Sequence, residues 1–236
     1  ADLPYVYAEL LPDDGSARQL ARKKFTSSAL MFYWGIKGER SPALLHHNVF
    51  LADDRYKASF DSIFKDLTLP EVPSFYINAP TRTEGNFAPA DGDGLMALVP
   101  VGHINEDRPQ DWEALKDKAR RFVQGRLKDI GLGYIGERMV FEETIGPPTY
   151  RQQWNLTKGS AFGLSHNFMQ VGYFRPHNRH PRYPNLYFVG ASTHPGTGLP
   201  IVLLSARLTV DRIAKENPKF NRQVSVLSKP LMEDHG

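Results

Sequence analysis

The sequence predicts an α/β or α+β fold, in which a mostly antiparallel or mixed sheet carries helices and the chain closes with a strand–turn–helix unit. Short apolar runs bounded by turn residues alternate with segments of helical periodicity, without an internal repeat or a low-complexity tract. The 236 residues are 41% hydrophobic and 23% charged, which is the composition of a folded globular chain. Disordered and fibrous classes are therefore excluded.

Apolar, β-branched and aromatic residues mark the predicted strands. The first run, residues 28–36, is rich in aromatic side chains and apolar on both faces, as is typical of an interior strand. The loop of residues 81–94 is dense in Asn, Asp, Gly and Pro. The predicted strands are residues 28–36, 48–51, 74–78, 95–101, 139–143 and 185–189.

Periodicities of three and four residues mark the predicted helices. The clearest one covers residues 109–128, with Asp107 and a proline at its start. A second begins near Asp54 and places aromatic residues on one stripe. Shorter segments at residues 147–154 and 198–214 complete the set, and residues 217–236 read as a polar tail.

Composition and charge exclude several classes of function. The 29 basic and 26 acidic residues give a net charge of +3 without a run of like charge, which disfavours nucleic acid as a partner. Since there is no cysteine, disulfides, thiolate metal sites and a cysteine nucleophile are absent. The spacing of His177 and His180 resembles a ligand pair, but without neighbouring ligands it favours a solvated loop, and no metal is predicted.

Residues 131–136 (GLGYIG) match the dinucleotide fingerprint GxGxxG in letters only. The phosphate-binding mechanism requires a strand before the glycines and a helix after them. Here a long predicted helix precedes the run and a predicted strand follows it. The sequence therefore predicts a helix-to-strand loop that binds no nucleotide.

The segment of residues 185–206 carries the most informative local pattern. A predicted strand ends at Gly190, small residues follow, and Pro200 occupies the first turn of a helix that is apolar nearly all round. A buried helix start exposes unpaired N–H groups and partial positive charge, so it favours an electron-rich partner. The alternative is an ordinary strand–turn–helix unit capped by water.

Residues 189–198 (VGASTHPGTG) resemble the C-terminal flavin-binding signature of carotenoid desaturases of the bacterial and fungal phytoene desaturase type, and look most like the fungal enzymes. Further similar stretches occur in the same order along the chain: residues 32–34, 47–52, 59–65, 73–76, 98–103 and 163–170. The likeness covers nearly the whole chain, and its final motif is the most specific part.

The resemblance implies that the chain is the C-terminal portion of an FAD-dependent enzyme. It implies a substrate-binding portion at residues 1–183, a return to a Rossmann-like FAD domain at residues 184–216, and an N-terminal GxGxxG domain that this chain lacks. His194 and Pro195 would lie beside the flavin ring, and Gly196 and Gly198 would permit its approach. The implied cofactor-binding residues are Gly190, Ala191, Ser192, Thr193, His194, Pro195, Gly196, Thr197, Gly198, Leu199 and Pro200.

The implied reaction removes two hydrogens across a carbon–carbon single bond of phytoene, with FAD as the acceptor. The proton-handling residue is not identified; Glu142, Glu143 and His166 are candidates, although ion pairs or surface positions explain each equally well. Large apolar side chains are the expected polyene contacts, with packing in a core as the alternative. These are Phe32, Trp34, Phe75, Tyr76, Phe162 and Phe168.

A C40 hydrocarbon must be collected from a bilayer, so the resemblance implies a peripheral, monotopic protein on the cytoplasmic side of a membrane. The longest apolar stretches are far shorter than the ~20 residues that span a bilayer. Basic residues Arg18, Arg22, Lys23 and Lys24 would contact anionic lipid or form a solvated helix face. A related flavin amine oxidase and an inactive fragment that serves in assembly are the alternatives, and homo-oligomerisation is left open.

Overall fold

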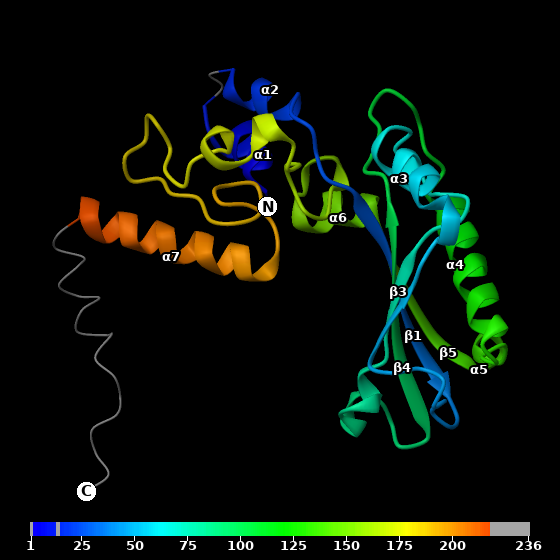
Figure 1. Cartoon of the computed structure of the whole chain (residues 1–236). Helices are drawn as coiled ribbons and strands as arrows, with labels where there is room; N and C mark the ends of the chain where they lie inside the picture. Colours follow the sequence, from blue (N-terminus) through cyan, green and yellow to red (C-terminus); the bar gives the residue numbers. More distant parts are fainter. Residues whose placement is uncertain (1, 13–14, 218–236) are drawn as a thin grey trace, which may run out of the picture. The chain divides into compact units, whose positions relative to one another are not determined.

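The structure of the chain is a computed structural model, and it describes residues 2–12 and 15–217 (Figure 1). The chain forms two compact units, residues 3–163 and residues 164–217 of the described part. The two units divide between Gly163 and Leu164, whereas the predicted domain boundary follows residue 183. All of the predicted polar tail except Asn217 lies outside the described residues.

The first unit is built on a five-stranded sheet with the strand order β2-β3-β4-β1-β5. Every pairing is antiparallel, which confirms the α+β class and the antiparallel form of the expected sheet. β1 lies between β4 and β5, as its apolar character predicted. The strands are β1 (Ser28–Lys37), β2 (His47–Phe50), β3 (Phe75–Asn78), β4 (Gly92–Val101) and β5 (Met139–Ile145).

The longest helix of the first unit, α4 (Trp112–Asp129), covers one face of the sheet (Figure 1). Its apolar stripe of Ala119, Val123 and Leu127 is fully buried in the core. The Asp111 side chain caps the helix by accepting a hydrogen bond from the N–H of Ala114 at 3.0 Å. The cap is therefore Asp111 and not Asp107, because Asp111 directly precedes the first helical residue.

Short helices and single turns connect the remaining elements of this unit. The run of residues 131–136 follows α4 and precedes β5, so the predicted helix before it and strand after it are confirmed. The connection is not a loop alone, because the short helix α5 (Ile135–Arg138) begins inside the run. The other elements of the unit are α1 (Leu3–Tyr5), η1 (Val6–Leu10), α2 (Ser16–Ala21), η2 (Asp53–Arg55), α3 (Tyr56–Phe64), η3 (Pro80–Arg82), η4 (Gly85–Phe87), α5 (Ile135–Arg138), α6 (Pro147–Trp154) and η5 (Thr157–Gly159).

Alternation along β1 gives the sheet two different faces. Leu30, Phe32, Trp34 and Ile36 belong to the buried core that α4 covers. The residues between them, such as Tyr33, belong to the opposite face, and Tyr33 is partly exposed. The sheet therefore has a second face, which is partly exposed.

The helix α3 differs from its amphipathic prediction. Its aromatic stripe of Tyr56, Phe60 and Phe64 is exposed at 65%, 47% and 43%, and of its side chains only Ser59 is buried. The rings of Phe60 and Phe64 lie 4.4 Å apart. The i, i+4 spacing was recognised correctly, but the stripe has no partner in the core of the described unit.

A buried ion pair joins the η3 turn to β4. Arg82 donates from both terminal nitrogens to the carboxylate of Asp93, at 2.9 and 2.8 Å. The Thr81 hydroxyl donates to the same carboxylate at 2.5 Å. Asp93 is 7% exposed, so this cluster is a buried and internally satisfied link between the loop and the sheet.

The second unit consists of long loops and the helix α7 (Leu199–Glu216). Two single turns, η6 (Phe168–Gln170) and η7 (Gly172–Phe174), interrupt the loops. The predicted strand at residues 185–189 is wrong: only an isolated bridge between Arg179 and Tyr187 is formed in the described residues. A strand requires a continuous ladder on a neighbour, and the Pro-rich segment opposite it does not provide one.

Candidate flavin site and apolar pocket

The loop of residues 190–198, called the motif loop here, leads directly into α7. Gly196 and Gly198 have φ angles of +152° and +107°, which favour glycine over any residue with a side chain. A Cβ on Gly196 would lie 2.7 Å from Nε2 of His166, so the loop passes directly against this ring. The His194–Pro195 peptide bond is cis.

A buried arginine ties the motif loop to an earlier segment of the second unit. Arg175 is 1% exposed and donates only to backbone carbonyl oxygens. On the motif loop it donates from Nε to Thr193 at 2.9 Å and from Nη2 to Ala191. Its other donations reach the carbonyls of Leu164, Ser165 and Gln170, at 3.0, 3.2 and 3.0 Å.

A second buried cluster fixes the centre of the motif loop to α7. The Asn178 amide donates to the carbonyl oxygen of His194 at 2.8 Å and to the Ser205 hydroxyl at 3.0 Å. Ser205, which is fully buried on α7, also donates to the carbonyl of His194 at 2.9 Å. Thr193 lies 3.3 Å from the same hydroxyl. The chain from Gly190 to His194 is thereby fastened to the helix.

His166 contacts the end of the motif loop. Its Nε2 accepts a hydrogen bond from the backbone N–H of Thr197 at 3.1 Å, so this nitrogen carries a lone pair. Partial burial of the ring, and secondarily the charge of Arg175, lower the pKa of His166 below its usual value. The neutral ring is therefore the form that fits this contact.

The start of α7 differs from the sequence prediction in its burial. Leu199 and Leu203 are 77% and 64% exposed, so the apolar helix start is not buried among the described residues. No side chain caps the helix at Gly198, and a Cβ there would meet only Ile201 at 3.9 Å. An open, uncapped helix start beside glycine backbone fits the electron-rich edge of a flavin, and it is where residues 190–200 would hold the cofactor.

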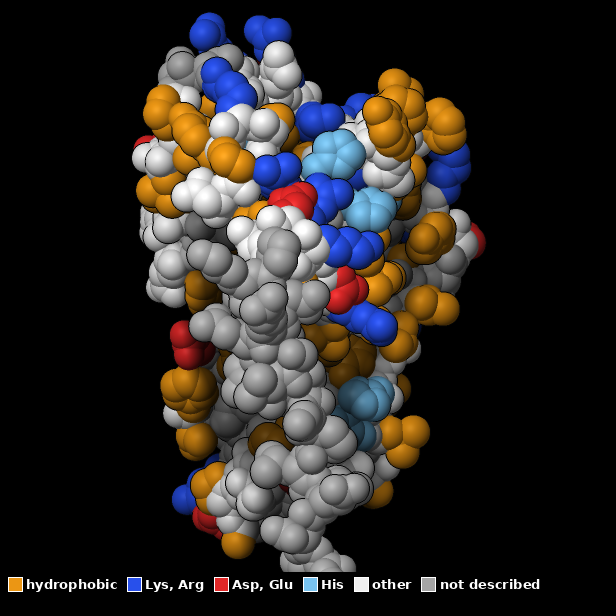
Figure 2. All heavy atoms as spheres, turned by 90° about the vertical axis from the view of Figure 1, so that its left-hand side faces the viewer, with side chains coloured by type: hydrophobic (Ala, Val, Ile, Leu, Met, Phe, Trp, Pro, Cys, Tyr) orange, Lys and Arg blue, Asp and Glu red, His pale blue; other side chains and the backbone are white. Residues whose placement is uncertain are grey.

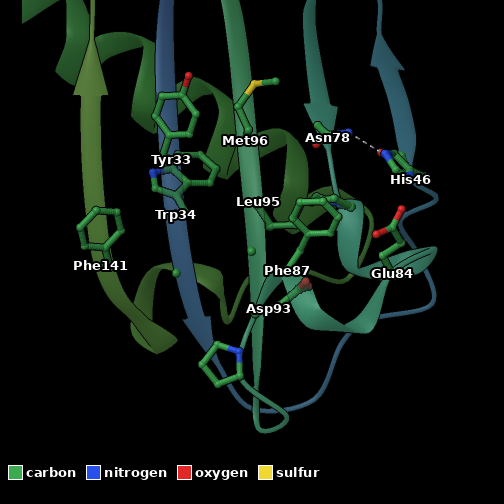
Figure 3. Close-up of a pocket in the computed structure, with 15 residues that line it drawn as sticks. Tyr33, Trp34, His46, Asn78, Glu84, Phe87, Asp93, Leu95, Met96 and Phe141 are labelled. Carbon is green, nitrogen blue, oxygen red and sulfur yellow. Dashed lines mark hydrogen bonds between the residues drawn. The ribbon is translucent and has the colours of Figure 1, made fainter.

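The first unit contains an apolar pocket of about 620 Å³ on the sheet (Figure 3). Tyr33, Trp34 and Gly35 of β1 contribute to its lining. Phe141 of β5 is paired across the strands with Gly35, whose missing side chain leaves room for the ring. The remaining lining residues are His46, Asn78, Pro80, Glu84, Phe87, Ala88, Pro89, Asp93, Gly94, Leu95 and Met96.

The six predicted polyene contacts lie in different environments. Phe32 and Phe75 belong to the buried core at 0% and 3% exposure, which favours the packing alternative for both. Trp34 is buried but also lines the pocket. Tyr76 does not line it; its hydroxyl lies 2.5 Å from Nδ1 of His47. Phe162 and Phe168 are exposed, at 41% and 80%.

The three candidate proton-handling residues also lie in different environments. Glu142 accepts hydrogen bonds from Arg120 and from Nε1 of Trp34 at 2.8 Å, so it is a structural ion-pair partner. Glu143 is exposed on the edge strand β5. Only His166 contacts the motif loop, and it does so as a hydrogen-bond acceptor.

Sequence reasoning missed the residues that fasten the motif loop. It treated residues 177–180 as a solvated loop, but Asn178 and His180 are 7% and 2% exposed, so that prediction is wrong for both. The described residues include no group of acidic, His or Cys side chains that could hold a metal ion. The signal for Arg175 was weak: a basic residue beside a proline with no nearby acidic residue.

The class of protein follows from comparison with known families. The family described as flavin containing amine oxidoreductases matches residues 51–214, and the chain belongs to this family. The match includes the strands β3, β4 and β5, Arg175, the motif loop and most of α7, and it begins after β1 and β2.

Curated relatives give a narrower similarity. The chain is 48% identical over 217 residues to a zeta-carotene-forming phytoene desaturase of Myxococcus xanthus, covering 90% of the chain and 41% of that protein. It is 42% identical to a phytoene desaturase of Neurospora crassa and 38% identical to one of Fusarium fujikuroi, each over 95% of the chain and 38% and 42% of the relative. The chain thus spans about two fifths of the length of these relatives, and the resemblance found in the sequence is confirmed.

Proposed function

We propose that this chain contributes to FAD-dependent desaturation of phytoene, a C40 carotenoid precursor, to a more conjugated carotene. The observation that carries the proposal is the motif loop, whose glycine backbone and uncapped helix start are fastened by buried Arg175, Asn178 and Ser205. Relatives named phytoene desaturase support the choice of substrate. FAD, when bound, accepts the two hydrogens that leave the carbon–carbon bond.

The residues of the second unit would bind and orient the cofactor. The motif loop offers backbone that a ring can approach closely at Gly198. The N–H groups at the start of α7 carry partial positive charge and would stabilise negative charge on a ligand. We propose that the ADP half of FAD binds a part of the full-length protein outside this chain, because the relatives extend well beyond the matched region and residues 131–136 follow a helix where a dinucleotide site requires a strand.

The pocket of the first unit would hold part of the polyene. Tyr33, Leu95, Met96 and Phe141 provide the aromatic and aliphatic surface that a hydrocarbon requires, and Figure 3 shows Tyr33, Met96 and Phe141 along neighbouring strands. Its polar groups, Glu84 and Asn78 among them, lie toward the β3 side of the pocket in this view. Burial of the apolar surface of the polyene would supply the binding free energy, and no hydrogen bond to the polyene would be needed.

The pocket assignment is tested with Phe141→Glu in the full-length protein. A carboxylate in the apolar lining should lower kcat/KM for liposome-held phytoene at least about tenfold, because burial beside the hydrocarbon removes its hydration. Val140→Glu is the matched control: Val140 neighbours Phe141, is 71% exposed and does not line the pocket. Equal activity of both variants would reject the pocket as the polyene site.

We propose further that the protein associates peripherally with the cytoplasmic side of a membrane to collect this substrate. Among the described residues, no helix is long and apolar enough to cross a bilayer. The exposed aromatic stripe of α3 is suited to the interface of a membrane. Lys57 and Lys65 beside it share one carboxylate, Asp61, so this face of α3 keeps a net positive charge for anionic lipid. Figure 2 shows blue Lys and Arg side chains interspersed with orange hydrophobic ones on another part of the surface.

Vesicle flotation tests the membrane proposal. Replacing Phe60 and Phe64 together by Ser should reduce binding to vesicles of phosphatidylcholine and phosphatidylserine about tenfold, because two aromatic side chains would no longer enter the interface. Ala58→Ser, at an exposed position on the same helix, is the control. Unchanged flotation of the double variant would remove α3 from the membrane contact.

A further inference from the structure

We propose that Arg175 and His166 are positioning residues that hold the motif loop in the conformation that receives the flavin, His166 doing so as a neutral hydrogen-bond acceptor. The inference rests on the proposed function, because it concerns the same cofactor. It goes beyond it by assigning a role to two side chains outside residues 190–200 and by predicting how flavin binding depends on pH.

Arg175 has the properties of a cross-link. Its guanidinium makes five donor contacts, three with residues 164–170 and two with the motif loop. No carboxylate pairs with it in the part of the chain that the structure describes, so the carbonyl oxygens alone compensate the buried charge. Burial lowers the pKa of Arg175 from its usual value, yet that value is so high that the group stays charged. The planar fork supplies five donors to the two segments, whereas a lysine would supply at most three.

His166 holds the loop at a third point. Arg175 fixes Ala191 and Thr193, and His166 fixes the N–H of Thr197 on the far side of Gly196. Protonation of Nε2 would place one N–H against another and break this contact. Among the residues that the structure describes, Arg175 is the charged group that acts on His166, and its positive charge opposes protonation of the ring. Acidification therefore removes one of the three attachments.

These attachments order the backbone before the cofactor arrives. A loop that is already held in its bound conformation loses less conformational entropy on binding, so the affinity is higher than for a free loop. The three attached residues, Ala191, Thr193 and Thr197, span the segment that contains Gly196 and that leads into Gly198. Loss of one attachment should therefore lower the affinity for FAD more than it lowers the stability of the fold.

The experiment measures the FAD dissociation constant of the full-length protein after removal and return of the cofactor. His166→Ala should raise it about three- to tenfold at neutral pH, and His166→Gln, which keeps an acceptor oxygen, should stay within about twofold of wild type. Arg175→Lys should raise it more than about tenfold, because several donor contacts are lost. His166 is a partly exposed residue, so its variants remain informative where Arg175 variants fail to fold.

A pH profile distinguishes positioning from a general structural role. The folded-state pKa of His166 is depressed, so its contribution is present at neutral pH and is lost as the pH falls through that pKa, below about 6.5. Wild-type FAD affinity should fall there, while His166→Gln should show a flatter profile. Wild-type affinity in His166→Ala, or parallel acid loss in wild type and His166→Gln, would overturn the proposal. A wild-type protein that binds no FAD at all would instead overturn the proposed function.

Discussion

Gly196→Ala in the full-length protein should lose FAD while the protein remains folded. The new Cβ would lie 2.7 Å from Nε2 of His166, and the φ angle of +152° disfavours any residue with a side chain. Either the His166 ring leaves its contact with the N–H of Thr197 or the motif loop shifts, and the backbone at residue 196 must also change its φ angle. We expect FAD binding to weaken about a hundredfold. The flavin absorbance of the purified protein measures this loss.

Gly133→Ala is the matched control for this prediction. Gly133 belongs to the run that matches the dinucleotide fingerprint in letters, and its Cβ would meet the flexible Lys128 side chain at 3.2 Å. That side chain can move, so FAD content should equal that of wild type. Loss of FAD in Gly133→Ala with an intact fold, or full FAD content in Gly196→Ala, would contradict the assignment of the motif loop.

Asp93→Ala should destabilise the first unit by about 3–5 kcal/mol. The substitution leaves the buried guanidinium of Arg82 without its carboxylate and also removes the acceptor of Thr81. The three tryptophans of the chain, Trp34, Trp112 and Trp154, all lie in the first unit. Urea unfolding of the chain followed by tryptophan fluorescence therefore reports this loss.

The same carboxylate predicts how the stability depends on pH. Burial raises the pKa of Asp93, but the hydrogen bonds from Arg82 and Thr81 outweigh burial and lower it below its usual value. A depressed folded-state pKa stabilises the protein above about pH 4, and this contribution is lost as the pH falls through the folded value. Asp91→Ala, at an exposed position nearby, is the control. An unchanged unfolding midpoint in Asp93→Ala would show that the ion pair adds no stability.

Local patterns predicted most of the first unit. Apolar runs such as residues 28–36 and the periodicity of residues 109–128 depend on neighbouring residues, and both elements formed within a few residues of the expected limits. The exposure of Phe60 and Phe64 was not predictable in this way, because periodicity shows that a stripe exists and not what covers it. Which aromatic residues enter the pocket depended on strand register: Phe141 lies over Gly35, whereas Phe32 points into the core.

The sequence predicted which loop forms the candidate site, but it did not predict the buried side chains that hold this loop in place. Glycines, Pro200 and the apolar helix are local signals, and they indicated residues 190–200, whose contact with flavin stays a prediction. Arg175 and Asn178 act on residues 16 positions further along the chain, through contacts that no spacing rule describes. Their charge and polarity also resemble those of a solvated loop. Only the folded arrangement distinguishes a buried arginine that binds carbonyls from an exposed one.

The most direct test of the proposed desaturation is an anaerobic mixing experiment with the full-length, FAD-loaded protein and phytoene held in liposomes. Without another electron acceptor, the visible flavin absorbance should bleach, and one new conjugated double bond should appear in the polyene spectrum for each flavin reduced. Liposomes without phytoene should leave the flavin oxidised. If phytoene causes no bleaching while a small amine does, the protein oxidises amines, and the pocket of Tyr33 and Phe141 does not bind a polyene for desaturation.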